Sequence, residues 1–210
     1  MDEPKTVISN INDAYTYISD CDPFKIHRAV LTSPWQDDAD VWVVGLRGTN
    51  GSFNRKDPLS MPVCFRSCCG KDNIFFSLVK NAIKEQIPAG AKVVFIGHSL
   101  GGMVCQQLGA DKELKNTYKL LNVLTFGSPY VIFKGKKCPL TRMAERADFI
   151  PHTCSVALLG NCFFGNIKHE SGGYYFKFPG AHCDSYQFSP VWRKYDCFGT
   201  ENGGRTLIIK

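Results

Sequence analysis

Apolar residues along the chain alternate between strand-like and helix-like spacing, and this pattern predicts alternating β and α elements. Short apolar runs with many β-branched residues predict strands over residues 25–31, 40–46, 92–97 and 120–126. Helical spacing of apolar residues predicts helices over residues 6–19, 73–87 and 102–109. Weaker patterns favour short strands at 146–150 and 174–178. This order predicts a mostly parallel central sheet with right-handed crossovers.

Local signals mark several boundaries of these elements. Asp72 is the expected N-cap of the helix over 73–87, and Pro88 ends that helix. A turn is expected at 34–38, between the first two strands. Residues 50–70 are rich in Gly, Asn, Ser, Pro and Cys and are expected to be irregular. Without a repeat or a clear linker, the pattern favours one compact α/β domain over residues 1–210.

The composition is that of a globular protein with a sizeable core. Hydrophobic residues make up 44% of the 210 residues, charged residues make up 21%, and no apolar run reaches membrane-spanning length. The first five residues lack the basic and apolar regions of a signal peptide, which favours the cytoplasm. The net charge of +6 would suit peripheral contact with an anionic membrane surface. The basic clusters are short and accompany no nucleic-acid-binding motif, so no nucleic-acid partner is expected.

Ten cysteines are many for a chain of this length, but none form a Cys-x-x-Cys pair. This spacing argues against a structural zinc site. The even number permits disulfides, whereas the lack of a signal peptide favours free thiols. The sequence leaves the redox state open.

The segment Gly-His-Ser-Leu-Gly at 97–101 joins a predicted strand to a predicted helix. In this setting Gly-x-Ser-x-Gly makes the serine a nucleophile. The sharp turn would strain the backbone of Ser99, so Gly97 and Gly101 would supply the small neighbours it needs. The helix N-terminus would place positive dipole beside the hydroxyl. The alternative interpretation is a glycine-rich turn with an unreactive serine.

A reactive serine needs a base and an acid that orients the base. The histidines are His27, His98, His152, His169 and His182. In this class the order along the chain is Ser, acid, His, which leaves the last three as candidates. Asp148 is the best acid, because it lies where a predicted strand passes into a loop closed by Pro151. Asp111 and Glu113 lie too far along the helix that follows Ser99.

Four segments resemble motifs of the class 3 lipase family, the fungal triacylglycerol lipases and their relatives, and occur in the family's order. They are the strand ending in Arg-Gly-Thr at 41–49, Gly-His-Ser-Leu-Gly-Gly at 97–102, Thr-Phe-Gly-Ser-Pro-x-Val at 125–131 and Asp-x-Ile-Pro at 148–151. Segments 169–176 and 182–186 match more loosely. The resemblance spans roughly residues 7–186 and implies an α/β-hydrolase fold.

The resemblance also implies roles for individual residues. It identifies Ser99, Asp148 and His182 as the catalytic triad. It assigns the oxyanion hole to the backbone N–H of Leu100 and to the backbone N–H and hydroxyl of Thr49. Arg47 is interpreted as a structural charge beneath that loop. No metal or cofactor is needed for this chemistry.

Two features bear on substrate choice. Residues 50–62 hold few apolar side chains and two prolines, which predicts no long amphipathic lid, weak interfacial activation and access for small esters. Five aromatic residues could line an acyl groove, although a place in the core is favoured. They are Phe163, Phe164, Tyr174, Tyr175 and Phe176.

The leading hypothesis is a serine carboxylic-ester hydrolase that acts on lipid esters, either acylglycerols or phospholipids. An acyltransferase or a thioesterase would use the same triad with another acceptor or substrate. A third hypothesis is a lipase-like fold that acts only as a protein-interaction scaffold, because a fold alone does not establish an activity.

Overall fold

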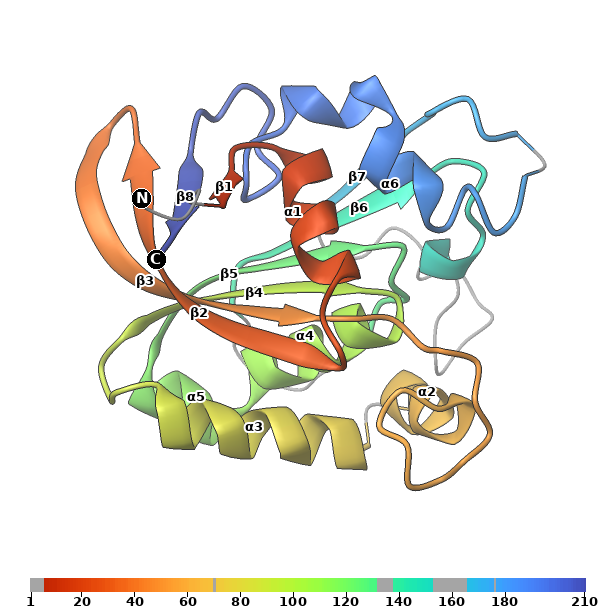
Figure 1. The fold of residues 1–210 in the computed structure, drawn as a ribbon, viewed down its shortest axis with the longest axis horizontal. Coiled ribbons are helices and arrows are strands. Elements are labelled where there is room, and N and C mark those ends of the chain that lie inside the picture. Colours follow the sequence, from red (N-terminus) through yellow and green to blue (C-terminus); the bar gives the residue numbers. More distant parts are fainter. Residues whose placement is uncertain (1–5, 70, 132–137, 153–165, 176) are drawn as a thin grey trace, which may run out of the picture.

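The computed structural model describes residues 6–69, 71–131, 138–152, 166–175 and 177–210. These residues form one eight-stranded mixed sheet with helices on both of its faces (Figure 1). The strands are β1 Val7–Ile8, β2 Phe24–Ser33, β3 Gln36–Leu46, β4 Lys92–His98, β5 Lys119–Phe126, β6 Leu140–Glu145, β7 Asn166–Glu170 and β8 Thr206–Ile209. The helices are α1 Ile11–Ser19, α2 Met61–Cys68, α3 Ile74–Gln86, α4 Leu100–Ala110, α5 Lys112–Thr117 and α6 Asp184–Phe188, with short 3₁₀ turns at Ile150–His152 and Pro190–Lys194.

The strand order across the sheet is β1-β8-β2-β3-β4-β5-β6-β7. The five strands from β3 to β7 run parallel, whereas β2, β8 and β1 pair antiparallel at the other end of the sheet. The predicted α/β class with a mostly parallel sheet is therefore confirmed. The carboxyl ends of β4, β5 and β6 share one edge, which is where ligands bind in open α/β sheets.

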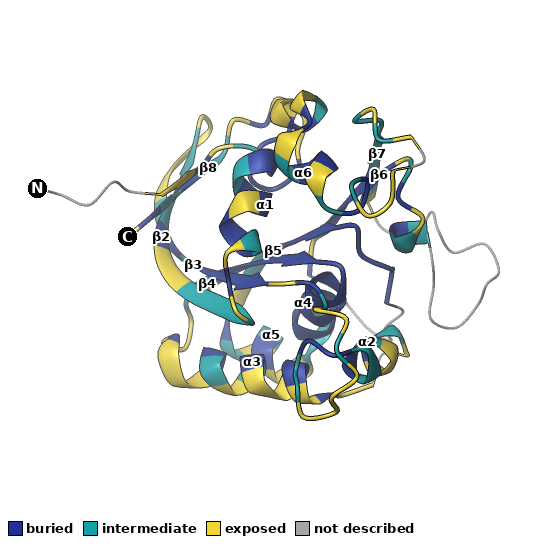
Figure 2. Ribbon diagram, turned by 45° about the vertical axis from the view of Figure 1, so that its right-hand side comes forward, coloured by how far each residue is buried: buried dark blue, intermediate teal, exposed yellow. Residues whose placement is uncertain are grey.

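Apolar side chains on the two faces of the sheet form two separate cores. On one face, α1 contributes Ile11 and Ile18 to a cluster that also includes Trp192. On the other face, α3 and α4 contribute Phe75 and Val104 to the second cluster. Figure 2 shows the consequence, because the central strands are buried while the outward sides of α1 and α3 are exposed. The central strands are accordingly apolar in nearly every position, as expected for strands covered on both sides.

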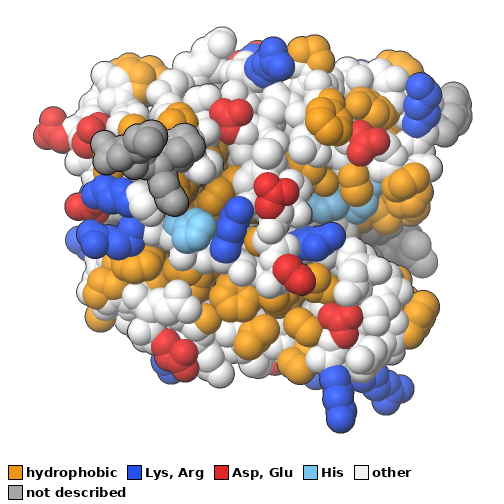
Figure 3. Space-filling model, viewed as in Figure 1, with side chains coloured by type: hydrophobic (Ala, Val, Ile, Leu, Met, Phe, Trp, Pro, Cys, Tyr) orange, Lys and Arg blue, Asp and Glu red, His pale blue; other side chains and the backbone are white. Residues whose placement is uncertain are grey.

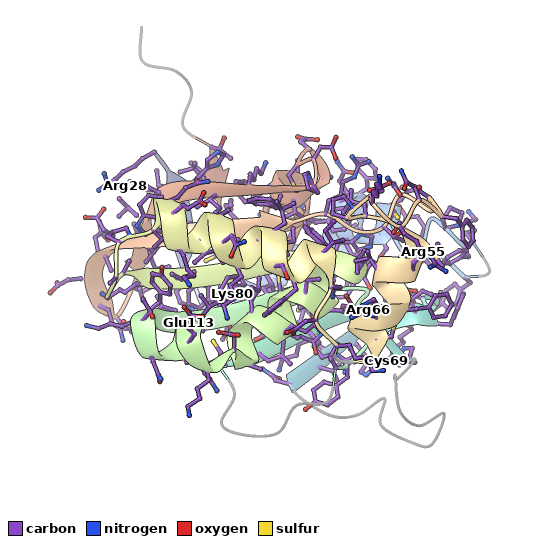
Figure 4. All side chains as sticks on the ribbon, turned by 90° about the horizontal axis from the view of Figure 1, so that it is seen from below. Arg28, Arg55, Arg66, Cys69, Lys80 and Glu113 are labelled. Carbon is purple, nitrogen blue, oxygen red and sulfur yellow. The ribbon has the colours of Figure 1, made fainter. Side chains whose placement is uncertain are left out.

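Charged side chains fasten α3 to α5 at the outer surface. Lys80 lies 2.9 Å from carboxylate oxygens of both Asp111 and Glu113, and Figure 4 shows Lys80 and Glu113 close together there. The N-cap of α3 is Asn73, whose side chain accepts a hydrogen bond from the N–H of Phe76. The prediction of Asp72 as the cap was therefore wrong by one residue, although the helix itself is confirmed.

Several elements differ from the sequence predictions. Residues 146–149, 174–175 and 177–178 are turns and loops, a 3₁₀ turn begins at Ile150, and residue 176 lies outside the described residues. The strands lie earlier in the sequence, at β6 and β7. β6 was hidden because it buries Thr141, Arg142 and Glu145, which interrupt any apolar pattern. Helices α2 and α5 were not predicted, and the segment 6–19 contains β1 before α1 begins.

Residues 50–60 contain turns, and the eight-residue helix α2 begins at Met61, within the segment 50–62 where no long lid was expected. No helix among the described residues is both long enough and apolar enough to cross a bilayer. The eight cysteines in the described part of the chain are free thiols, and Cys154 and Cys162 lie outside it.

Candidate active site

Ser99 occupies the sharp turn between β4 and α4. Its backbone has φ 51° and ψ −117°, a conformation that is strained for a residue with a side chain. Two hydrogen bonds hold it there: its N–H donates to the carbonyl of Phe126 at 2.9 Å, and its carbonyl accepts from Met103 N–H at 3.1 Å. This is the backbone geometry expected of a nucleophilic serine at a strand-to-helix turn.

Gly97 and Gly101, two residues before and after Ser99, lie so close to other backbone atoms that neither position has room for a side chain. A Cβ atom on Gly97 would lie 2.6 Å from the carbonyl oxygen of Gly101. A Cβ atom on Gly101 would lie 2.5 Å from the carbonyl oxygen of Leu46. Both distances are too short for a side chain, so the prediction that these neighbours must be small is confirmed.

The structure brings Asp148 and His182 into direct contact. Nδ1 of His182 lies 2.7 Å from Oδ2 of Asp148. The Asp148 side chain is completely buried and that of His182 is 11% exposed. The other carboxylate oxygen accepts from Ile150 N–H, and the hydroxyl of Tyr186 lies 3.4 Å from Oδ2. Because the carboxylate oxygens are surrounded by donors, the ion is compatible with its burial.

Gly127, at the end of β5, makes room for this pair. Its φ is +52°, and a Cβ atom there would lie 2.8 Å from Oδ2 of Asp148 and 2.9 Å from the ring of His182. The chain therefore leaves β5 directly against Asp148 and His182.

His182 also lies beside the nucleophile turn. Its ring centroid is 4.6 Å from that of His98, the residue before Ser99, and Nε2 of His98 lies 2.8 Å from its carbonyl oxygen. Among the described residues the Ser99 hydroxyl makes no hydrogen bond, so the Ser99–His182 contact is not closed. Such contacts are often long without substrate and tighten when it binds.

The predicted oxyanion residues lie near Ser99 in the chain or across a close backbone approach. A Cβ atom on Gly48 would lie 3.3 Å from Cβ of Ser99, so the chain passes the nucleophile just before Thr49. Leu100 begins α4, and neither its N–H nor that of Thr49 donates to another described residue. The Thr49 hydroxyl donates to the carbonyl of Leu59 at 2.6 Å and accepts from Gly51 N–H at 3.1 Å. Its one proton is therefore engaged, and the backbone N–H groups are the donors left available.

The remaining histidines have other partners. His27 lies in β2, where Nδ1 is 3.2 Å from the hydroxyl of Tyr17. His152 and His169 stack on each other with ring centroids 5.1 Å apart. Burial lowers the pKa of both stacked rings, and their pKa is lowered further by the charge of Arg142. Of the three bases that the chain order left open, only His182 contacts Asp148.

The other candidate charges lie away from the triad or lack partners. Asp111 caps α5 and pairs with Lys80. Arg47 is exposed, and its guanidinium makes no hydrogen bond or ion pair with another described residue. The interpretation of Arg47 as a charge that ties down the loop therefore has no contact to support it.

A cavity of about 190 Å³ adjoins this region. Its lining includes Tyr15, Arg47, Thr49, His98 and Cys183. It therefore lies between α1 and the loop that follows β3. No group of three His, Cys, Asp or Glu side chains in the described parts of the chain is arranged to hold a metal ion.

Two exposed aromatic side chains near the pair were not singled out from the sequence. Phe149 and Phe178 are 58% and 54% exposed, and their ring centroids are 5.2 Å apart. The Phe178 centroid lies 5.9 Å from that of His182. Figure 3 shows pale blue histidine atoms beside orange hydrophobic side chains on the face seen in Figure 1. In the sequence, Phe149 follows Asp148 by one residue and Phe178 precedes His182 by four. This closeness in sequence could have identified the two aromatic residues as neighbours of the pair.

Of the five aromatic residues assigned to the core, Tyr175 is 62% exposed, and its hydroxyl accepts from that of Ser171. The core assignment is therefore wrong for Tyr175. Tyr174 is half-buried, and the other three, Phe163, Phe164 and Phe176, lie outside the described residues.

Comparison with known proteins gives no family assignment. No protein-family model matches the sequence, and no curated protein is significantly similar to it. The functional conclusion therefore depends on the residues and geometry described above.

Proposed function

We propose that this protein is a serine carboxylic-ester hydrolase with an α/β-hydrolase fold of the class 3 lipase type, acting on lipid esters. One observation carries the proposal: a buried carboxylate–imidazole pair contacts His98 in the strained strand-to-helix turn that also carries Ser99. Strain and burial of this kind cost stability and concentrate at functional sites. The motif resemblance supports the same assignment independently of the geometry.

In the proposed reaction, Oγ of Ser99 attacks the ester carbonyl and Nε2 of His182 takes the hydroxyl proton. Asp148 holds Nδ1–H of His182, which fixes the tautomer and stabilises the imidazolium. The backbone N–H groups of Thr49 and Leu100 bind the oxyanion. His182 then returns the proton to the leaving alcohol, and water releases the acyl group by the same steps.

The surroundings of His182 favour an apolar acyl group or an apolar surface. Phe149 and Phe178 expose large apolar rings beside the base, where they can contact an acyl chain without first being uncovered. The net charge of +6 favours peripheral contact with an anionic lipid surface. The absence of a helix over residues 50–60 favours small water-soluble esters as further substrates.

The decisive experiment compares Ser99→Ala with Ser77→Ala, at an exposed position of α3. Both purified variants are assayed for hydrolysis of a short-chain p-nitrophenyl ester and for labelling by a fluorophosphonate. We expect the wild type and Ser77→Ala to hydrolyse the ester and to be labelled, and Ser99→Ala to do neither. A folded wild-type protein that is neither active nor labelled would contradict the proposal, as would full activity of Ser99→Ala.

A further inference from the structure

His98 connects the nucleophile turn to the backbone of the proposed base. Its Nε2 lies 2.8 Å from the carbonyl oxygen of His182. A carbonyl oxygen only accepts hydrogen bonds, so Nε2 must carry the proton and donate. Among the described residues no other group donates to this carbonyl.

The state of the His98 ring follows from its surroundings. Its pKa is lowered to about 3, mainly by burial and secondly by the charge of the nearby His182, while the hydrogen bond to the His182 carbonyl raises the pKa by a smaller amount. The ring is therefore neutral at neutral pH, with its proton on Nε2 and a free lone pair on Nδ1.

Neighbours on two sides hold this ring in place. A Cβ atom on Gly48 would lie 2.7 Å from Nδ1 of His98, so the loop before Thr49 passes directly against the ring. Tyr15 of α1 contacts the ring edge-on, with centroids 5.2 Å apart and planes at 75°. His98 thus contacts the oxyanion loop, α1 and the base-carrying loop at once.

We propose that His98 is a positioning residue that sets the place of the His182 ring relative to Ser99. The inference rests on the proposed function and assigns a role within the same site. The hydrogen bond begins one residue before the nucleophile and ends on the backbone of the base itself. His182 lies in a loop of successive turns before α6, outside any strand. Losing the donor leaves a buried carbonyl unpaired and frees this loop to shift.

The test uses two substitutions of His98 and one control. His98→Phe keeps a ring but removes the donor, whereas His98→Gln places an amide N–H near the position of Nε2. His27→Phe, on the exposed side of β2, controls for replacing a histidine by phenylalanine. For His98→Phe we expect kcat for a short ester to fall by about 10- to 100-fold with KM nearly unchanged, because a misplacement of about 1 Å has this effect. His98→Gln should recover most of the loss, and His27→Phe should match the wild type.

A second measurement does not depend on activity. In proton NMR spectra, the Nδ1–H of His182 should give a strongly deshielded signal from its hydrogen bond to Asp148. His98→Phe should broaden or remove this signal at a temperature where the variant is folded, and His98→Gln should retain it. An unchanged signal in His98→Phe would overturn the inference even if the protein hydrolyses no ester. Unchanged kcat in His98→Phe, with an active wild type, would overturn it while leaving the proposed function intact.

Discussion

Asp148 and His182 are 34 positions apart in sequence, yet Nδ1 of one lies 2.7 Å from Oδ2 of the other. Asp148 follows β6 by three residues, and His182 precedes α6 by two. Gly127 at the end of β5 leaves the space in which they meet. The pairing therefore depends on three separate segments of the fold, and its disruption is the most direct test of the site.

Asp148→Asn should reduce kcat by about 10⁴-fold while the protein stays folded. The amide can present its NH₂ to Nδ1 and favour the wrong tautomer of His182, as replacement of the acid does in known Ser-His-Asp hydrolases. The measurement is steady-state ester hydrolysis together with thermal unfolding. Activity within tenfold of wild type would show that Asp148 is not the orienting acid.

Gly127→Ala should lose both stability and activity, whereas Gly173→Ala should lose stability alone. Both glycines have positive φ, so both variants carry backbone strain on the order of 1–2 kcal/mol. Only at Gly127 would the new Cβ meet Asp148 and His182, since nothing lies within 4 Å of the Cβ at Gly173. Unfolding in denaturant and kcat separate the two effects. Equal activity of the two variants would contradict the described packing.

The buried His98 should make stability rise with pH. Its pKa is lowered from 6.5 to about 3 in the folded protein, so between these values the unfolded chain binds a proton that the native protein does not. The free energy of unfolding therefore increases from about pH 3 to about pH 6.5, by up to a few kcal/mol at about 1.4 kcal/mol per pKa unit. His98→Phe should have a shallower slope in this window. The other histidines with lowered pKa are present in both proteins, so parallel slopes would refute the assignment to His98.

Replacing Phe149 and Phe178 together by serine should lower activity on long-chain or vesicle-bound esters more than on a short soluble ester. Both rings are exposed, so the fold should tolerate the change. Trp35→Ser is the matched control, because Trp35 is 70% exposed in the β2–β3 hairpin. The readout is the ratio of the two activities. An equal loss on both substrates would indicate that the aromatic pair does not contact the acyl chain.

The sequence predicted the elements that carry continuous apolar patterns, such as β4, β5 and α3, and the strained turn at Ser99. It missed β6 because Arg142 and Glu145 are buried there through hydrogen bonds, which no hydrophobic pattern records. Spacing alone could not select among the last three histidines, because the choice depends on which loop returns to Asp148. The sequence could not predict that the Thr49 hydroxyl donates to the carbonyl of Leu59, because Leu59 lies ten residues away in an irregular segment.

The pairing of Leu46 with Gly97 in parallel strands makes the chain leave β3 and β4 at the same level. Backbone hydrogen bonds join the two ends of the loop that follows β3. The N–H of Asn50 donates to the carbonyl of Leu59, and the N–H of Met61 donates to the carbonyl of Ser52. A loop tied off at its base in this way can be lengthened or exchanged while the strand ends stay fixed. Residues 53–58 are accordingly the place to graft foreign loops without disturbing the strand ends that carry the candidate site.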